Sequence, residues 1–340
     1  TNTYLDTERT QSSSSTTLGH VAAVYPYPTC RGNLVFAFGV FQAGNSSLET
    51  VKEGSIEDPG VTAENEYLQS GTIYQYHFGA GADLSPNVAI GGGLVIWDES
   101  IESTDWIGTE PLGGSWQDDV SMDLDGVSFS AGLLLRATEI LQAGFTFTSP
   151  AWLELSGSGL TSDEEGYSEG FIEDEYTLPM KLTGGLALLL PSLTVAADLT
   201  YADYSQTKYN GLSITSELDP GNEHVLEETL GFRIGAEVNL PGAPLSLRAG
   251  YRYEPLELST VEEIAYLDGG SPASIVADFE TERDRSFFTF GAGALIDGVL
   301  ALDFAVAIGG YEKVTASGAT EILTEERAIT EVIVSGAYRF

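Results

Sequence analysis

The sequence predicts an all-β protein, a 14-stranded antiparallel transmembrane β-barrel of the bacterial outer membrane. Three observations predict it: apolar and polar residues alternate with a period of two, the alternating segments are long, and short connections between them alternate with long ones. No segment approaches the roughly 18 uninterrupted apolar residues that a transmembrane helix needs, which excludes that class. Because no linker or shift in composition divides the chain, we expect one barrel domain over residues 1–340.

The segment Leu245–Glu254 shows the alternation. One set of alternate residues reads Leu, Leu, Ala, Tyr, Tyr and the other reads Ser, Arg, Gly, Arg, Glu, so one face of the strand is apolar and the other polar. Strands of soluble proteins usually run about 5–6 residues. The alternating runs of this chain extend over about 10 to 20 residues, and a membrane barrel needs about 10 per crossing, with its apolar face toward lipid and its polar face toward the lumen.

The pattern predicts an even number of strands, as a closed bacterial barrel requires. The fourteen predicted strands cover residues 2–10, 16–26, 32–44, 69–83, 87–99, 118–136, 139–155, 172–189, 192–208, 226–240, 244–257, 281–296, 299–314 and 325–340. Six connections are short, at 26–31, 83–87, 136–139, 189–192, 240–244 and 296–299, and most of the others are longer loops. Short periplasmic turns and long extracellular loops are the topology of an outer-membrane barrel, so we expect both termini in the periplasm.

Aromatic residues gather where the two membrane interfaces are expected, as in the girdles of such barrels. The predicted lower girdle is Tyr25, Tyr27, Tyr338 and Phe340, and the upper one is Trp97, Trp152, Tyr253 and Tyr311. The chain ends on a strand with a terminal aromatic residue, which resembles the C-terminal assembly signal of outer-membrane proteins. It begins with Thr1 and carries no signal peptide, so we expect a processed or truncated form.

The chain is strongly acidic, with 51 Asp and Glu against 14 Lys and Arg. This balance excludes nucleic acid as a partner, because a phosphate backbone needs a basic surface. Most of the acids are expected in the extracellular loops or beside them, for example at 99–105, 163–175 and 257–284. Two interpretations remain open: the acids serve solubility or a salty habitat, or divalent cations bridge them to lipopolysaccharide or to a protein partner. The segment 162–175 is dense enough in carboxylates for Ca²⁺ but lacks EF-hand spacing.

No arrangement of residues in the sequence predicts an enzyme or a resident cofactor. The one cysteine, Cys30, lies in a Pro-rich turn and is expected to be free or bonded to a partner chain. The three histidines are far apart in sequence and form no zinc pattern. The run Gly91–Gly93 is not followed by Lys and Ser or Thr, so it is not a phosphate loop; it allows a strand to bend or another backbone to approach.

Several stretches resemble the FadL/TodX family of outer-membrane transporters for long-chain fatty acids and other hydrophobic compounds. They are Val24–Pro26 with Arg31–Gly39, Ala197–Ser205, Leu247–Tyr251 followed by Glu254 and Pro255, Phe290–Gly293, and Gly336–Phe340. The resemblance implies a barrel that takes up hydrophobic molecules passively. One departure is that the family's N-terminal hatch, which plugs the lumen and carries an Asn-Pro-Ala motif, has no counterpart in this sequence. The hatch is cleaved, absent from this form or lost, and the family's gating mechanism is therefore not transferred to this chain.

The candidate ligand-binding residues are basic residues at the alternate strand positions that we expect to face the lumen. Arg233 lies on one strand and Arg248 and Arg252 on the next, and the turn at 240–244 sets a register that brings Arg233 close to 248–252. Lys181 and Arg136 face the lumen on other strands by the same parity. These side chains would anchor the carboxylate of a fatty acid. Alternatively, the arginines pair with the lumen acids Glu237, Glu254, Asp198 and Asp303 and brace the wall.

Two classes of function remain. The first is an outer-membrane channel for passive uptake of hydrophobic molecules such as long-chain fatty acids, which predicts an apolar path in the lumen and a lateral opening near a kinked strand. The second is a barrel that transports nothing and serves as a scaffold or partner subunit of a secretion system, an electron conduit or a surface complex. The missing hatch, the single cysteine and the acidic extracellular face favour the second class, and the family resemblance favours the first.

Overall fold

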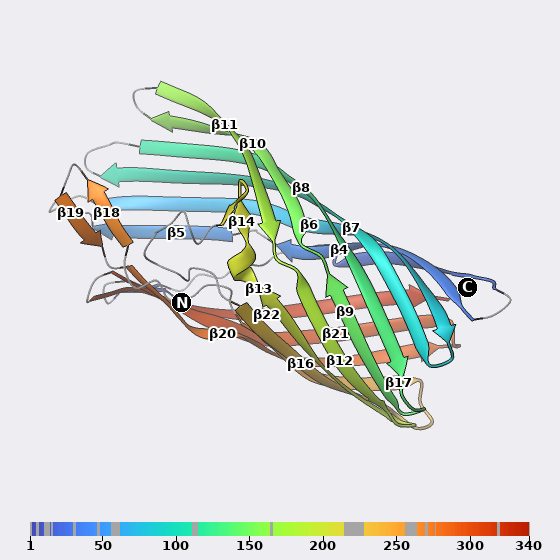
Figure 1. Cartoon of the computed structure of the whole chain (residues 1–340). Coiled ribbons are helices and arrows are strands. Elements are labelled where there is room, and N and C mark those ends of the chain that lie inside the picture. Colours follow the sequence, from blue (N-terminus) through green and yellow to red (C-terminus); the bar gives the residue numbers. More distant parts are fainter. Residues whose placement is uncertain are drawn as a thin grey trace.

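The structure is a computed structural model that describes residues 2–4, 7–9, 14, 16–29, 32–45, 48–55, 62–110, 115–163, 166–213, 228–255, 264–268, 271–275, 277–317 and 320–339. Its dominant feature is one large, strongly tilted antiparallel sheet that curls around a central space (Figure 1). Within the described residues, no helix has the length and apolarity needed to cross a membrane. Cys30 lies outside the described residues, so its predicted role stays untested.

Thirteen strands follow one another around the wall, each paired with the next in antiparallel register. They are β3 (His20–Tyr27), β4 (Leu34–Asn45), β6 (Thr62–Ser85), β7 (Val88–Glu110), β8 (Ser115–Arg136), β9 (Leu141–Thr148), β12 (Lys181–Leu189), β13 (Leu193–Asp203), β16 (Glu228–Asn239), β17 (Leu245–Glu254), β20 (Ala277–Ile296), β21 (Leu300–Ser317) and β22 (Thr320–Tyr338). The six short turns between them lie at one end of the wall, which we call the short-turn end; the opposite end is the long-hairpin end.

The first predicted strand, 2–10, is wrong as a single wall strand. The described residues form two short strands, β1 (Asn2–Tyr4) and β2 (Thr7–Arg9), which pair antiparallel with each other, and β1 also pairs with β22. Asn2 lies opposite Glu325, far along β22 from Tyr338. Asn2 and Tyr338 therefore lie toward opposite ends of the wall (Figure 1), and the prediction that both termini are periplasmic stays a prediction.

Several predicted extracellular loops are in fact continuous strand. β6 has 24 residues, β7 has 23 and β8 has 22, so these strands run far past the length of one membrane crossing. The acid-rich segments 99–105 and 163–175 lie mainly in strands, in β7 and in the hairpin of β10 (Ala151–Asp163) and β11 (Gly166–Leu178). The sequence missed these extensions because a strand that leaves lipid needs no apolar face, although its backbone ladder continues. β5 (Leu48–Ser55) extends the wall in the same way beside β6.

Two neighbouring strands bend together where the prediction had unbroken strands at 139–155 and 172–189. β9 ends at Thr148 and β10 begins at Ala151, and the chain between Thr148 and Trp152 has one residue more than the facing part of β8, which is a β-bulge. Pro150 cannot donate to the ladder. The hydroxyl of Ser149 instead accepts from the backbone N–H of Phe129 at 3.0 Å. The strands β11 and β12 are interrupted at Pro179, at the same height in the wall as the interruption between β9 and β10. Above it, the β10–β11 hairpin extends beyond the end of β13 (Figure 1).

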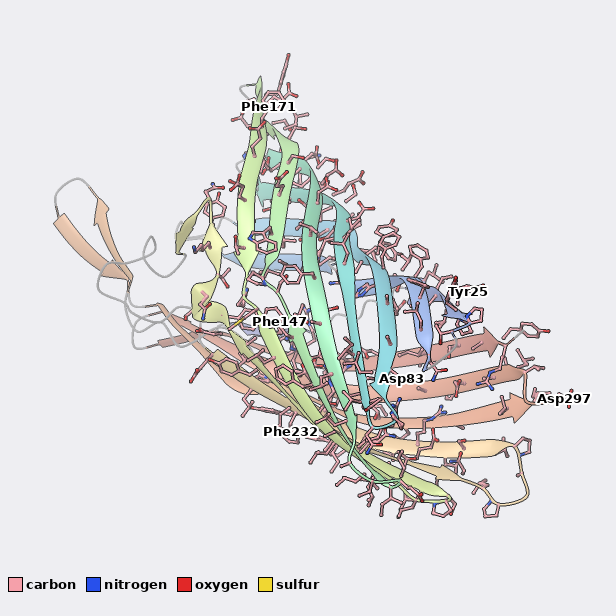
Figure 2. All side chains as sticks on the ribbon, turned by 45° about the vertical axis from the view of Figure 1, so that its right-hand side comes forward. Tyr25, Asp83, Phe147, Phe171, Phe232 and Asp297 are labelled. Carbon is pink, nitrogen blue, oxygen red and sulfur yellow. The ribbon has the colours of Figure 1, made fainter. Side chains whose placement is uncertain are left out.

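The outer face of the wall is apolar. Leu199, Phe232, Phe288, Phe304 and Val334 are between 39% and 78% exposed, and all have the outward parity of their strands. An outward apolar band is the surface that a transmembrane barrel presents to hydrocarbon. Figure 2 shows Tyr25 at the edge of the wall and Phe171 on the β10–β11 hairpin, away from Asp83 and Asp297 near the short turns.

The predicted upper aromatic girdle is correct only in part. Trp152 faces outward and is 46% exposed. Trp97 has the parity of the lumen instead, and its indole N–H donates to the hydroxyl of Ser128 at 3.1 Å. Tyr311 has the lumen parity as well, and the Arg327 guanidinium lies 5.6 Å from the centre of its ring. These rings were misplaced because aromatic residues favour strands on either face.

Candidate functional site in the lumen

Ion pairs that skip a strand identify the face of the wall that lines the lumen. Arg252 on β17 contacts Glu331 on β22 at 3.2 Å, although β20 and β21 lie between these strands. Arg248 on β17 reaches Asp303 on β21 past β20. Side chains of strands that are not neighbours meet only on the concave side of a curved sheet. The polar parity predicted from the sequence is therefore the inner one.

The turn at 240–244 sets the predicted register of β16 and β17. The Leu240 N–H donates to Leu245 O at 2.9 Å, and Gly242 has a φ of 79°, which a residue with a Cβ rarely adopts. In this register Arg233 lies directly opposite Arg252, and Glu237 directly opposite Arg248. The structure thus brings together three of the five predicted site residues, and all three arginines line one cavity of about 400 Å³.

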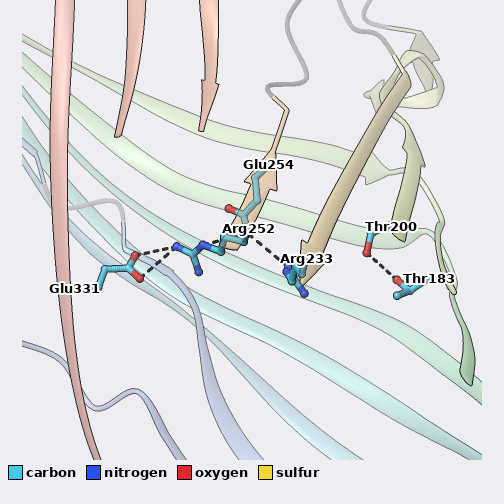
Figure 3. Close-up of polar contacts among 6 residues, drawn as sticks. All are labelled: Thr183, Thr200, Arg233, Arg252, Glu254 and Glu331. Carbon is cyan, nitrogen blue, oxygen red and sulfur yellow. Dashed lines mark hydrogen bonds and ion pairs between the residues drawn. The ribbon is translucent and has the colours of Figure 1, made fainter. Parts of the chain in front are cut away.

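Every one of these three arginines has at least one carboxylate partner. Arg248 binds Glu237 with its Nε at 2.6 Å and binds Asp303 through Nη1. The Glu254 carboxylate lies between the two opposed arginines, 3.4 Å from Arg233 Nη2 and 3.6 Å from Arg252 Nε (Figure 3). Two cations directly opposite each other on neighbouring strands repel. Glu254 therefore holds together a pair that would otherwise destabilise the wall.

A glycine makes room for one of these pairs. Gly293 on β20 lies between Arg248 and Asp303, and a Cβ built on it would lie 3.1 Å from Arg248 Nη1 and would overlap the Asp303 carboxylate. The absence of a side chain at this position lets the ion pair cross over β20. The sequence predicted a strand over 281–296 but gave no sign of this role for Gly293.

Asp198 differs from the acids that pair with arginine. It lies opposite Arg233 in the register of β13 and β16, and it lines the same cavity. One of its carboxylate oxygens is buried and has no hydrogen-bond partner within the described part of the chain. The sequence had grouped Asp198 with Glu237, Glu254 and Asp303 as a partner of the arginines. Its geometry sets it apart, since no ion pair to it is formed.

The other two predicted site residues lie away from this cluster. Arg136 is near the short-turn end, where its Nη1 contacts Asp83 at 3.1 Å. Lys181 lies at the bend between β11 and β12, with its Nζ 5.9 Å from the centre of the Tyr204 ring. Threonines line the wall next to Lys181, and the hydroxyls of Thr183 and Thr200 are 3.0 Å apart (Figure 3). The five predicted residues therefore do not form one site.

The opposite part of the lumen carries no charge over a long stretch. Gly79 lies opposite Gly93 and Gly81 opposite Gly91 in the ladder of β6 and β7, and these glycines share the inner parity. The other inner residues at this level include Val24 on β3, Ala37 and Gly39 on β4, His77 on β6 and Val95 on β7, so a histidine is the one titratable side chain among them. Glycine and small apolar residues here leave the backbone close to the lumen. We call this stretch the uncharged strip.

No metal centre is formed by the residues that the structure describes. No group of three or more His, Cys, Asp or Glu among them is placed to hold a metal ion. This includes the described acids of 162–175, for which the sequence predicted capacity for Ca²⁺; Glu164 and Glu165 of that segment lie outside the described residues. The acids are instead spread along extended strands, where alternate residues point to opposite faces.

Sequence reasoning missed two acids that matter to the lumen. Glu331 pairs with Arg252, and Asp83 pairs with Arg136. Both have the inner parity in strands that the sequence had predicted, so parity was the available signal. What was not available is the register, since it accumulates over three strand pairings between Arg252 and Glu331.

Comparison with known proteins supports the fold. No protein-family model matches the chain, and no curated protein matches its sequence. A FadL homologue from Pseudomonas aeruginosa has 15% identity and a TM-score of 0.58, over 94% of this chain and 77% of that one. The toluene transporter TodX of Pseudomonas putida has 15% identity and a TM-score of 0.57, over 94% and 82%. The toluene transporter TbuX of Ralstonia pickettii has 14% identity and a TM-score of 0.52, over 93% and 80%. The chain thus has the antiparallel fold of FadL-type outer-membrane β-barrels, as its sequence resemblance predicted.

Proposed function

We propose that this protein lies in a bacterial outer membrane and conducts hydrophobic molecules through its lumen by passive diffusion. The outward apolar band, the short turns at one end and the acidic hairpins at the other support this location. The matched structures include proteins named as toluene transporters and a monoaromatic hydrocarbon channel, which supports hydrophobic compounds as the substrate class.

The observation that carries the proposal is the uncharged strip. An apolar solute crosses a barrel most readily where it does not displace water from ionised groups, because desolvating a charge is costly. The ladder of β6 and β7 offers such a surface in its two directly opposed glycine pairs. The charged cavity beside Arg233, Arg248 and Arg252 lies on other strands of the wall.

The ion pairs of the lumen favour a neutral substrate over a fatty acid. Each of Arg233, Arg248 and Arg252 already has a carboxylate partner within 4 Å. The carboxylate of a fatty acid anchored there would stand beside the carboxylates that already partner these arginines and would be repelled by them. A neutral hydrocarbon is not repelled in this way. In this proposal the arginines line the path and brace it, and the carboxylate anchor predicted from the sequence is the alternative to be tested.

The test compares uptake of toluene and of oleate by bacteria that lack other channels for hydrophobic compounds and that produce this protein. We expect faster toluene uptake, with little change for oleate. In the variant Arg233→Ala, oleate uptake distinguishes the two substrate classes: a fall supports the carboxylate anchor, and no change supports a neutral substrate. If neither compound enters faster than in cells without the protein, the channel function is wrong.

A matched pair of variants tests the route. Ala37 and Ala196 are both exposed alanines of inner parity, the first in the uncharged strip and the second in the lining of the charged cavity. We expect Ala37→Asp to slow toluene uptake several-fold, because it places a charge on the apolar route, and Ala196→Asp to have little effect. Equal effects of the two would show that the strip is not the route.

A scaffold or partner role is the second candidate, and the β10–β11 hairpin favours it. Tyr167 and Phe171 are 82% and 81% exposed near the tip of this acidic hairpin, beyond the apolar band. Large exposed aromatic residues on a charged surface are typical of contact sites. A protein that co-purifies in stoichiometric amount and is lost in Phe171→Ser would support this role.

A further inference from the structure

The strand β11 has one edge that is fully paired and one that is mostly unpaired. It pairs with β10 along its whole length, from Gly166 to Leu178. On its other edge it pairs only near its lower end, with β14 (Lys208–Tyr209). Within the described residues, no backbone pairing extends along this edge between Glu175 and the tip of the hairpin. The upper part of β11 therefore has a free edge at the long-hairpin end of the wall.

Asn210 ends the pairing on this edge of β11. Its N–H donates to Glu175 O at 2.8 Å, and its side-chain Oδ1 accepts from the Glu175 N–H at 2.7 Å. The turn at Asn210 and Gly211, where φ is 48° and 80°, then leads into β15 (Leu212–Ser213), which pairs with β14 and not with β11. Both backbone groups of Glu175 thus face the edge that becomes free beyond it.

Four residues of β11 present their backbone groups at the free edge. Backbone groups of a strand point alternately to its two neighbours. The N–H and C=O of Tyr167, Glu169, Phe171 and Glu173 therefore face the same way as those of Glu175, and the register with β10 has no bulge to change this. An unpaired row of such groups is a template for a further strand.

The side chains of the same four residues lie on the outer face of the hairpin. Their parity is that of Thr177, which lies opposite the outward-facing Trp152. All four are exposed, and none makes a hydrogen bond, an ion pair or a ring contact within the part of the chain that the structure describes. Aromatic and acidic side chains alternate along the free edge. A strand added there meets an apolar contact and an anionic contact in turn.

The outer face beside this edge carries acids and no bases. Asp98, Asp125, Glu154 and Glu175 lie directly opposite one another in one row across β7, β8, β10 and β11. Like charges in this arrangement repel. The strands β7, β10 and β11 contain no lysine or arginine, and β8 contains only Arg136, at the short-turn end. Basic side chains of a partner relieve this repulsion.

A groove on the same face fits the side chain of a lysine or an arginine. Its volume is about 270 Å³, and Glu169, Leu160, Asp119 and Glu102 line it together with small residues. The Asp119 carboxylate is held in place by a hydrogen bond from the Thr104 hydroxyl at 2.8 Å. A long basic side chain packs its aliphatic stem on apolar surface while its charged head stays in a polar environment. Leu160 and the carboxylates around it provide both.

Three kinds of occupant differ in how they fit the free edge. A second copy of this chain brings its own acids to the edge, and copies with a formal net charge of -37 repel each other. The phosphates of lipopolysaccharide are anionic as well, and a lipid has no run of alternating donors and acceptors to pair with a backbone. An extended, basic protein segment satisfies the backbone edge and the carboxylates together.

We propose that the free edge of β11 binds an extended segment of a partner protein as an added strand, with lysine or arginine at the positions that face Glu169 and Glu173. Main-chain hydrogen bonds supply the attachment, and the basic side chains supply the specificity. The residues of the segment that face Tyr167 and Phe171 pack against these rings. The inference rests on the partner role proposed above for the β10–β11 hairpin and not on what the lumen conducts.

The first test measures hydrogen exchange in the full chain in detergent micelles, with a peptide as the probe. The peptide has about nine residues, with lysine and tyrosine in turn at alternate positions and threonine between them. We expect it to slow exchange of the amide hydrogens of Glu169, Phe171 and Glu173 at least about tenfold, while amides of β7, which is paired on both edges, do not change. Slow exchange at these three residues before the peptide is added shows that the edge is already covered, and it overturns the proposal.

Two altered peptides separate strand addition from attraction between charges. The first is methylated on every backbone nitrogen, so it keeps its lysines but cannot donate to β11. The second has glutamate in place of lysine. We expect both to bind at least about tenfold more weakly than the parent peptide. Equal binding of the methylated peptide overturns the proposal, because charge alone then explains the affinity. Protection of the same amides by lipopolysaccharide vesicles with Ca²⁺, and not by the parent peptide, overturns it in favour of a lipid occupant.

The second test exchanges one charge at the free edge. Glu173→Lys is expected to weaken binding of the lysine peptide at least about tenfold and to strengthen binding of the glutamate peptide, which also shows that the variant is folded. Asp123→Lys is the matched control, because Asp123 lies in the same row as Glu173, on β8, with Ser156 of β10 between them. We expect the control to weaken binding less than about threefold. Equal losses in the two variants, or no loss in Glu173→Lys, overturn the proposal.

The peptide measurements are independent of the tests of the channel and of the partner. Toluene uptake by Glu173→Lys is expected to equal that of the parent protein, because Glu173 lies on the outer face of the hairpin and not in the lumen. A protein that conducts no toluene, or that co-purifies with no partner, is still expected to bind the lysine peptide. Failure of the proposed function and failure of this inference therefore give different results.

Discussion

The two sides of the lumen are built in different ways. On β16, β17 and β20–β22, arginines and carboxylates form pairs that reach past neighbouring strands, and Gly293 leaves space for one of them. On β6 and β7, glycines lie opposite glycines and no charged side chain crosses the lumen at that level. The ion pairs of the first side add contacts between strands but occupy part of the lumen. The second side leaves the lumen open, and its strands are held together by backbone hydrogen bonds. If the lumen conducts solutes as proposed, we expect them to pass along the second side.

The strongest test of the charged side removes the acid between its two opposed arginines. Glu254→Gln leaves Arg233 facing Arg252 with no anion between them, and we expect a loss of about 2 kcal/mol in the free energy of unfolding. Urea unfolding in lipid vesicles measures it. Glu331→Gln, which removes the partner of one arginine only, is the control and should lose less than half as much. Equal losses would show that repulsion between the arginines is not what Glu254 offsets.

A substitution with a smaller expected effect tests whether Gly293 matters because it leaves space for an ion pair. Gly293→Val places a side chain where Arg248 and Asp303 meet, and we expect a loss of about 1 kcal/mol, because the pair must separate. Gly144→Ala is the control, since a Cβ there has nothing within 4 Å. Its stability should be unchanged in the same urea titration. A comparable loss in Gly144→Ala would mean that glycines stabilise the wall only through backbone geometry.

The smallest expected effect is that of salt. Ion pairs on the charged side are partly exposed, with Arg233 at 57% and Arg248 at 43%, so raising NaCl from 0.1 M to 1 M should weaken them by a few tenths of a kcal/mol. The stability difference between Glu254→Gln and the parent protein should therefore change with salt, whereas that between Gly144→Ala and the parent should not. A salt response of the same size in both differences would contradict the division into two sides.

The sequence predicted the contacts within the β16–β17 hairpin better than the contacts between this hairpin and distant strands. Alternation and a tight turn at 240–244 were enough to place Arg233 opposite 248–252, because register within one hairpin depends only on the turn. The pairing of Arg252 with Glu331 depends on three successive registers, which no local pattern contains. The sequence contains Pro150 and Pro179, but the bend could not be predicted from them alone. It also depends on the register with β8, which has one residue fewer opposite the stretch around Pro150. Beyond the apolar band, the long hairpins lost the alternation that had revealed the strands.

The length of β6 has a consequence for how solutes arrive. Its 24 residues, at about 3.3 Å each and tilted by about 40°, rise roughly 60 Å, against an apolar band of about 25 Å. The acid-bearing ends of the long strands therefore stand well above the bilayer, and screening confines their field to about 8 Å in physiological salt. A diffusing molecule meets that field only as it enters between the hairpins. For a protein that acts as the proposed channel, we expect the local concentration of anions to fall there and that of neutral molecules to stay unchanged, so the rim would sort solutes by charge before they reach the lumen.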